Sequence, residues 1–276
     1  MPLYQVIVLA VIQALTEFIP VSSSAHLELA PILLGWKDPG LAFDIALHFG
    51  TLLALILYFF KDWLQVIAEG LGMQYGNDSQ LRRNPKLLWY MIAGTIPLGL
   101  AGLLFKKQAE TVWRNSYLIG FMLVAVGLLM WFAERAARAR KQIGDISFAD
   151  AALIGAAQAL AVVPGTSRSG ITISTGLIRD LTRETAARFS FLLSAPAIAA
   201  TALKGFWDLQ KHEGGVPPDM VVPFIVGILI SGVGGAVVIG YFLKYLRGHS
   251  LMPFIYYRLI FGIIVVALHV LRVTAE

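Results

Sequence analysis

The sequence predicts an all-α integral membrane protein with six transmembrane helices and two re-entrant helix-loop-helix hairpins, arranged as an inverted-topology repeat. The 276 residues are 57% hydrophobic and only 14% charged, with a mean hydropathy of +0.72, whereas soluble domains carry about 25% charged residues. Six stretches are apolar enough to cross a bilayer, and two further apolar segments are broken by proline and resemble each other. We therefore expect a single membrane domain over residues 1–276.

Each expected span holds about 20 mostly apolar residues, the length that a helix needs to cross the hydrocarbon core. The spans are Leu41–Phe60, Leu87–Phe105, Ser116–Ala133, Thr185–Phe206, Val221–Tyr245 and Leu251–Val273. The chain has no cysteine, which excludes disulfides, thiolate metal sites and cysteine nucleophiles. The net charge of +5 suits anionic lipid head groups, and no basic-aromatic array indicates nucleic acid.

Two apolar segments, Leu3–Leu34 and Phe148–Ile178, are broken in the middle by Pro20 and Pro164. Each predicts a helix of about four turns, a Pro/Ser loop and a shorter second helix. The stretch Leu27–Leu34 is too short to cross the membrane alone. We therefore expect two re-entrant hairpins that each enter and leave on one side.

The two hairpin segments resemble each other, and each is followed by three spans. Val11–Leu15 matches Ala156–Leu160, and Pro20–Ser24 matches Pro164–Arg168 if one gap is allowed, which pairs Ser23 with Ser167. Three spans are an odd number, so the second copy is expected to be inverted relative to the first. The copies cover about residues 1–144 and 145–276, and such repeats place their site near the membrane midplane. Chance similarity between two alanine-rich segments is the alternative.

The distribution of Lys and Arg over the two faces orients the chain. One face collects Lys61, Arg82, Arg83, Lys86, Arg135, Arg138, Arg140, Lys141, Arg179, Arg183, Lys244 and Arg247. The other face collects Lys37, Lys106, Lys107, Arg114, Lys204, Lys211 and Arg272. Twelve cationic residues against seven make the first face cytoplasmic. Both termini and the first hairpin are then expected to face outward.

The second hairpin loop, Pro164–Gly170, has the chemistry of an anion site. Arg168 stands among hydroxyl residues at a depth where a charge costs roughly 2.5–3.5 kcal/mol. A helix starting near Gly170 would add backbone N–H groups and the positive end of its dipole. The expected phosphate-binding residues are Ser22, Pro164, Gly165, Ser167, Arg168, Ser169 and Thr172. The alternative is a polar helix break that only packs against its neighbours.

The first hairpin carries the groups expected to do chemistry. Gln13 and Glu17 share a helix face, and Glu17 is a plausible ligand for a hard divalent cation, with Gln13 offering a neutral oxygen. His26 can transfer a proton or be phosphorylated, and Ser23 can be a nucleophile. The alternatives are a protonated Glu17 bonded to another helix, a structural His26 and a capping Ser23.

Further polar residues lie in or near the apolar spans: Glu28, Asp44, His48, Arg188 and Arg258. Arg188 and Arg258 are expected to pair with carboxylates or to extend towards the head groups, and they are left outside the catalytic set.

The stretch Gln13–His26, read together with Pro164–Thr172, closely resembles the undecaprenyl-diphosphate phosphatase family associated with bacitracin resistance. The family's signatures are a Glu/Gln-xxx-Glu box running into a Pro-Val-Ser-Ser-x-x-His loop, and a Pro-Gly-x-Ser-Arg-Ser-x-x-Thr box. Both are complete here, and Pro253–Arg258 fits a third segment of the family. The resemblance covers essentially the whole chain.

The resemblance implies an enzyme of the bacterial cytoplasmic (inner) membrane that hydrolyses undecaprenyl (C55 isoprenyl) diphosphate to the monophosphate and inorganic phosphate. The distribution of Lys and Arg predicts that its site faces the periplasm or cell exterior. The resemblance also implies that Glu17, Ser23, His26 and Arg168 act in catalysis, and that Glu17 and Gln13 hold Mg²⁺ or Ca²⁺. Whether Ser23 or His26 attacks phosphorus stays open. The partners expected are the isoprenyl diphosphate lipid, the bilayer and a second copy in a homodimer.

The main competing interpretation is a secondary transporter or lipid flippase, because inverted repeats with broken helices are typical of transporters. A second membrane phosphatase superfamily would need a histidine and an aspartate where this chain has Ser174 and Ile178, so that assignment fails on spacing.

Overall fold

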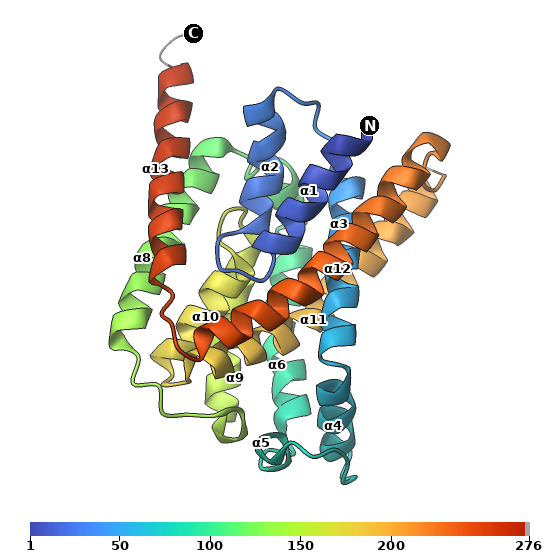
Figure 1. Cartoon of the computed structure of the whole chain (residues 1–276). Helices are drawn as coiled ribbons and strands as arrows, with labels where there is room; N and C mark the ends of the chain where they lie inside the picture. Colours follow the sequence, from blue (N-terminus) through green and yellow to red (C-terminus); the bar gives the residue numbers. More distant parts are fainter. Residues whose placement is uncertain (213, 274–276) are drawn as a thin grey trace.

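The computed structural model describes residues 1–212 and 214–273, and this part of the chain folds into helices without a single strand (Figure 1). The α-helices are α1 (Leu3–Thr16), α2 (Ser23–Leu34), α3 (Leu41–Tyr58), α4 (Phe60–Gly70), α5 (Ser79–Arg82), α6 (Leu87–Leu104), α7 (Lys106–Glu110), α8 (Ser116–Ala136), α9 (Phe148–Gln158), α10 (Arg168–Ile178), α11 (Arg183–His212), α12 (Val221–Leu246) and α13 (Met252–Val273). Short 3₁₀ turns are η1 (Ile143–Asp145), η2 (Ala159–Val162) and η3 (Pro218–Met220).

The prediction of six spans is confirmed within the described residues. Helices α3, α6, α8, α11, α12 and α13 are long and apolar enough to cross a membrane. The largest difference is α11, which continues for nearly two turns beyond its expected end at Phe206, through a mostly polar stretch that ends at His212. Many large apolar side chains stay exposed, such as Leu103, Val233 and Tyr241, as a surface solvated by lipid requires.

Both proline-broken segments are helix-loop-helix units, as predicted. Helices α1 and α2 flank the first loop, and α9 with η2 and then α10 flank the second. In Figure 1 the N-terminus and the far end of α13 lie at one end of the molecule, where α1 begins, whereas α9 begins at the opposite end. The two units therefore reach the middle of the molecule from opposite ends.

The start of α9 is fixed by Asp150, a fully buried carboxylate. It forms a capping box with Ser147 and accepts hydrogen bonds from Lys141 and Arg179. Burial alone would raise the pKa of Asp150, but the hydrogen bonds from Ser147, Lys141 and Arg179 outweigh it and lower the pKa to about 2. The second unit is thereby anchored at its outer edge by a charged cluster.

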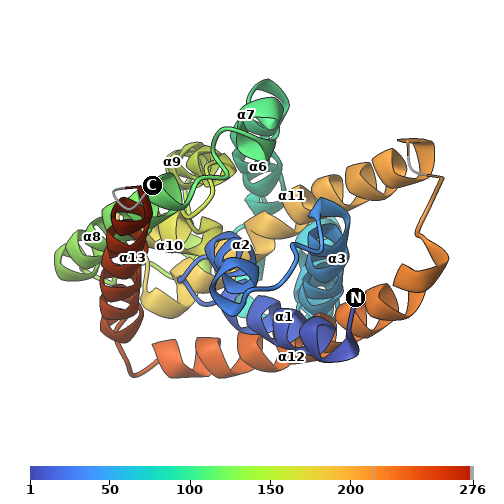
Figure 2. The ribbon, with the colours of Figure 1, turned by 90° about the horizontal axis from the view of Figure 1, so that it is seen from above.

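Glycines allow the helices to approach closely. The crossings with a glycine on each helix are α3 with α12 (Gly50 and Gly232), α8 with α13 (Gly120 and Gly262) and α6 with α9 (Gly94 and Gly155). Such contacts between small residues are how membrane helices associate when lipid supplies no hydrophobic driving force. Viewed from above, α2 and α10 occupy the centre, with α8 and α13 on one side and α3 on the other (Figure 2).

Candidate functional site

The two predicted loops meet in the interior of the protein. Arg168 Nη2 donates to Glu17 Oε1 at 2.7 Å, joining residues that lie 151 positions apart in the chain. The side chains of Arg168 and Glu17 are 12% and 6% exposed. Gly165 N donates to Ser24 Oγ at 3.3 Å, and Ser169 Oγ donates to the Ile19 carbonyl at 3.4 Å. The loops are therefore held together by direct hydrogen bonds as well as by the ion pair.

The turns that carry the site have the same local geometry. Ser22 and Ser167 each cap a helix at positive φ, 78° and 66°, and each accepts a hydrogen bond from the N–H three residues on. Each also contacts the serine two positions later. These pairs are 145 positions apart (22 and 167, 24 and 169), as are Gln13 and Gln158.

This common register corrects the expected pairing of Ser23 with Ser167. The gap in the sequence comparison was introduced to match the two prolines, but the backbone aligns the two capping serines instead. The structural counterpart of Ser23 is consequently Arg168. Each is the first residue of its helix.

Glu17 is the centre of the polar cluster. Its Oε2 accepts from Ser23 Oγ at 2.6 Å and from Gln13 Nε2 at 3.1 Å. His48 Nε2 lies 3.6 Å from the same oxygen. Because a carboxylate accepts a hydrogen bond from the serine hydroxyl, Glu17 can take the proton of Ser23 when that oxygen attacks.

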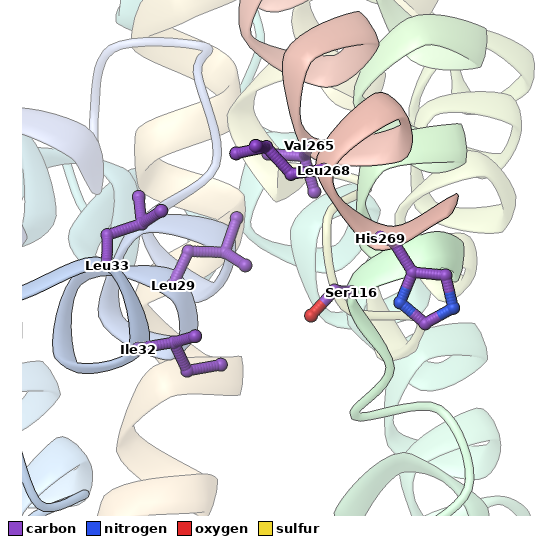
Figure 3. Close-up of a pocket in the computed structure, with 7 residues that line it drawn as sticks. All are labelled: Leu29, Ile32, Leu33, Ser116, Val265, Leu268 and His269. Atoms are coloured by element: carbon purple, nitrogen blue, oxygen red, sulfur yellow. The ribbon is translucent and has the colours of Figure 1, made fainter. Parts of the chain in front are cut away.

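Arg168 keeps part of its guanidinium free. Nη1 is buried and has no hydrogen-bond partner, while Nη2 is used on Glu17. A buried donor without a partner costs stability, so this atom is available for an anionic ligand. The seven residues drawn in Figure 3 line a small cavity, and none of them is a predicted site residue. A larger one of about 300 Å³ is lined by residues that include Ser24, His48 and Pro164.

The hydrogen bonds of His26 go to residues outside this cluster. Its Nδ1 bonds the Ser22 carbonyl at 2.7 Å and its Nε2 bonds the Tyr257 hydroxyl at 2.6 Å, with the ring stacked on Tyr257 and Phe261. A carbonyl only accepts, so Nδ1 carries the proton and Nε2 accepts from Tyr257. Both ring nitrogens of His26 are therefore occupied. The structure brings together Gln13, Glu17, Ser23 and Arg168, and it gives His26 a different environment.

Most of the other predicted ligand residues shape the loops. Ser22 and Ser167 cap helices, and Thr172 Oγ1 lies 2.6 Å from Ser190 Oγ on α11. Gly165 has φ of 87°, and a Cβ there would stand 2.6 Å from the Ile119 carbonyl oxygen. Only glycine fits that crossing of the second loop with α8.

The predicted cation site offers two oxygen donors. Gln13 Oε1 is buried and has no hydrogen-bond partner, while Nε2 of the same amide donates to the Glu17 carboxylate. Within residues 1–212 and 214–273 there is no group of three His, Asp or Glu side chains that could hold a metal ion. One carboxylate and one amide oxygen fit a hard cation whose remaining ligands are water and phosphate oxygens.

Several site residues escaped the sequence analysis or were undervalued by it. Thr51 lies 3.5 Å from Gln13 Nε2, and Tyr257 holds His26. The prediction for Arg188 is confirmed, because it pairs with Asp62 and Asp78. The prediction for Arg258 is wrong, because it is fully buried and bonds main-chain carbonyls instead of a carboxylate. The signal for Arg258 was a cation within an apolar span.

Comparison with known proteins finds relatives over nearly the whole chain. The model of the family described as "Bacitracin resistance protein BacA" matches residues 6–264. A protein of Moorella thermoacetica named undecaprenyl-diphosphatase is 44% identical over 272 residues, covering 99% of this chain and all of the relative. One of Pelotomaculum thermopropionicum with the same name is 42% identical, covering 99% of this chain and 98% of the relative. "Undecaprenyl-diphosphatase 2" of Stutzerimonas stutzeri is 44% identical, with 97% and 98% covered.

Proposed function

Because this chain belongs to the bacitracin resistance protein BacA family, we propose that it hydrolyses undecaprenyl diphosphate to undecaprenyl phosphate and inorganic phosphate. The reaction recycles the lipid carrier used in cell-wall synthesis and so counters bacitracin. The observation that carries the proposal is the buried cluster in which Glu17 bonds both Ser23 and Arg168. It combines a nucleophile, a base and an anion-binding group within one site.

The geometry supports Ser23 as the attacking group. Its hydroxyl oxygen forms a bond to the terminal phosphorus while its proton passes to Glu17, which it already contacts at 2.6 Å. The anhydride bond breaks and undecaprenyl phosphate leaves. Glu17 passes the proton that it took from Ser23 to the leaving undecaprenyl phosphate. Water then attacks the phosphoserine, Glu17 accepts the proton of the water, and the bond between phosphorus and the Ser23 oxygen breaks as that proton returns to the oxygen. Arg168 Nη1 binds a phosphate oxygen and offsets the charge that builds up around phosphorus.

The divalent cation, Mg²⁺ or Ca²⁺, would be held by Glu17 and Gln13 and would supply positive charge against the diphosphate oxygens. Gln13 Oε1 faces no donor in the protein, which supports its use as a ligand. His26 orders the first loop in this mechanism, because its two nitrogens bond Ser22 and Tyr257.

The membrane arrangement belongs to the same proposal. We propose that the two helix-loop-helix units are re-entrant hairpins of an inverted repeat, with the capping turns at Ser22 and Ser167 as equivalent points. The site then faces the periplasm or cell exterior of the inner membrane, together with both termini. The isoprenyl tail lies among the exposed apolar side chains of the spans.

Phosphate release by the purified protein in detergent tests the function. We expect release of inorganic phosphate from undecaprenyl diphosphate with Mg²⁺ or Ca²⁺, and its loss after chelation by EDTA with recovery when metal is added back. A transporter or flippase needs a membrane to act across, so hydrolysis in detergent separates the two functions. A folded protein that releases no phosphate with either metal would contradict the proposal.

A further inference from the structure

Arg258, in α13, is the largest fully buried side chain of the described residues. It lies within a mostly apolar span. An ionised side chain is costly there unless its donors are satisfied. Arg258 therefore has to be explained by what its guanidinium contacts.

All of its hydrogen bonds go to main-chain carbonyls. Nη1 donates to Pro20 of the first loop at 3.4 Å, and Nη2 donates to Gly165 and Thr166 of the second loop at 3.0 and 3.1 Å. Nη2 and Nε also donate to Met122 and Leu123 of α8 at 3.2 Å each. A single planar group thus joins both loops of the site to the helix behind them.

The charge of Arg258 is also unlike that of Arg168. Arg168 is neutralised by Glu17, whereas no ion pair involves Arg258 in residues 1–212 and 214–273. Its Nη1 lies 3.4 Å from the place of a Cβ on Gly170, in the first turn of α10. The guanidinium of Arg258, which has no carboxylate partner, therefore lies next to the first turn of α10, where the anion is expected to bind.

We propose that Arg258 is a positioning residue for the hydrolysis, which holds the loops of Ser23 and Arg168 in one register and supplies uncompensated positive charge beneath the phosphate. The proposal rests on the proposed function, but its effect on the loops can be measured without substrate. The geometric role belongs to the directed donors, and the electrostatic role belongs to the charge. The two roles can be separated by substitution.

Arg258→Lys keeps the charge but loses the planar set of donors, and Arg258→Met loses both. For Arg258→Lys we expect kcat to fall about 100-fold, because a misplacement of about 1 Å costs that much, while KM stays within about threefold of wild type. For Arg258→Met we expect the same loss in kcat together with a KM raised at least about tenfold, since removing the unneutralised charge weakens anion binding.

Arg188→Met is the matched control. It also removes a partly buried guanidinium, but one that pairs with Asp62 and Asp78 and contacts neither loop. Even if Arg188→Met lowers the melting temperature as much as Arg258→Met does, its kcat should stay near the wild-type value. If it loses as much activity as Arg258→Met, the role of Arg258 is only to stabilise the fold and the proposal is overturned.

A distance measurement tests the loops themselves. The chain has no cysteine, so Ile32→Cys on α2 and Leu160→Cys on η2, both exposed, can carry spin labels without a background. When Arg258 is present, pulsed EPR should show one narrow distribution of the distance between the two labels, both in the otherwise unsubstituted protein and in Arg188→Met. In Arg258→Met the distribution should be broad. A narrow distribution in Arg258→Met would overturn the proposal. If the wild type hydrolyses no diphosphate, the function fails but this measurement still decides the loop role.

Discussion

Ser23 and Arg168 occupy equivalent places in two turns of the same shape. Each follows a capping serine at positive φ and is the first residue of its helix, and each side chain bonds Glu17. One place supplies a hydroxyl and the other a guanidinium. The two different groups that bond Glu17 therefore come from equivalent positions in the two turns.

The identity of the attacking atom can be decided by substitution. We expect Ser23→Ala to lower kcat by about 10³-fold or more, because the residual rate would come only from binding and charge stabilisation. Thr175→Ala, which removes a hydroxyl that bonds the Ile171 carbonyl within α10, should cost less than about tenfold. Mass spectrometry of wild type quenched with denaturant at neutral pH, so that neither phosphoserine nor phosphohistidine is hydrolysed, should find phosphate on Ser23. Phosphate on His26, with activity retained in Ser23→Ala, would contradict the mechanism.

Sequence reasoning found the residues of the site that belong to one loop or one helix face. Glu17, Ser23 and Arg168 were predicted because a carboxylate, a serine loop and an arginine are unusual at membrane depth. Tyr257 and Thr51 were missed because they reach His26 and Gln13 from other helices, and only the packing of α13 and α3 brings them there. Arg258 was noticed but assigned the wrong partners, since a sequence does not show which main-chain carbonyls lie near a side chain.

At the scale of the elements, α3 and α12 form one of the close helix crossings. A Cβ on Gly50 would stand 2.5 Å from the Ile228 carbonyl oxygen and would collide with the Ser231 hydroxyl. The backbone of α12 cannot move away without disturbing α1, which also packs on it. This crossing positions Thr51, whose hydroxyl accepts a hydrogen bond from Gln13, and so it helps to fix a side chain of the site.

We expect Gly50→Ala to destabilise the protein by about 1–3 kcal/mol, the usual cost of overpacking a tight contact. Gly99→Ala on α6 is the control, because no atom outside its own helix backbone lies within 4 Å of that Cβ position. It should be neutral or slightly stabilising, since alanine favours helix by about 1 kcal/mol over glycine. Thermal unfolding in one detergent measures the stability of both variants. Equal melting temperatures would contradict the claim that Gly50 is tightly packed where α3 crosses α12.

The spans were predictable because hydrophobic length alone identifies a membrane helix. The short helices α4 and α7 were not predicted, because they are too short and too polar for that criterion. The register between the two helix-loop-helix units was also missed by one residue. Prolines guided the sequence comparison, whereas the equivalence in space is between the capping serines Ser22 and Ser167.

At the scale of the whole molecule, two units enter from opposite ends and meet in the middle (Figure 1). The proposed orientation places the end with α1 and α2 outside the cell and the end with α4 and α5 in the cytoplasm. Lys37, in the loop after α2, and Asn77, before α5, are both exposed. They mark the two ends of the molecule.

Single cysteines at these positions report the orientation. In intact cells, a membrane-impermeant maleimide should label Lys37→Cys but should label Asn77→Cys only after the membrane is permeabilised. The unsubstituted chain has no cysteine, so it should not be labelled and serves as the negative control. Labelling of Asn77→Cys alone in intact cells would reverse the proposed orientation.

The ion pair between Glu17 and Arg168 also constrains how the protein is made. The two residues are separated by 151 positions, so the first is synthesised roughly 8 to 30 s before the second at about 5–20 residues per second. During that interval the carboxylate has no guanidinium partner and is too costly to bury in hydrocarbon. In the proposed membrane arrangement, we therefore expect the first helix-loop-helix unit to stay at the water interface, or to insert with Glu17 protonated, until the segment that carries Arg168 has been synthesised.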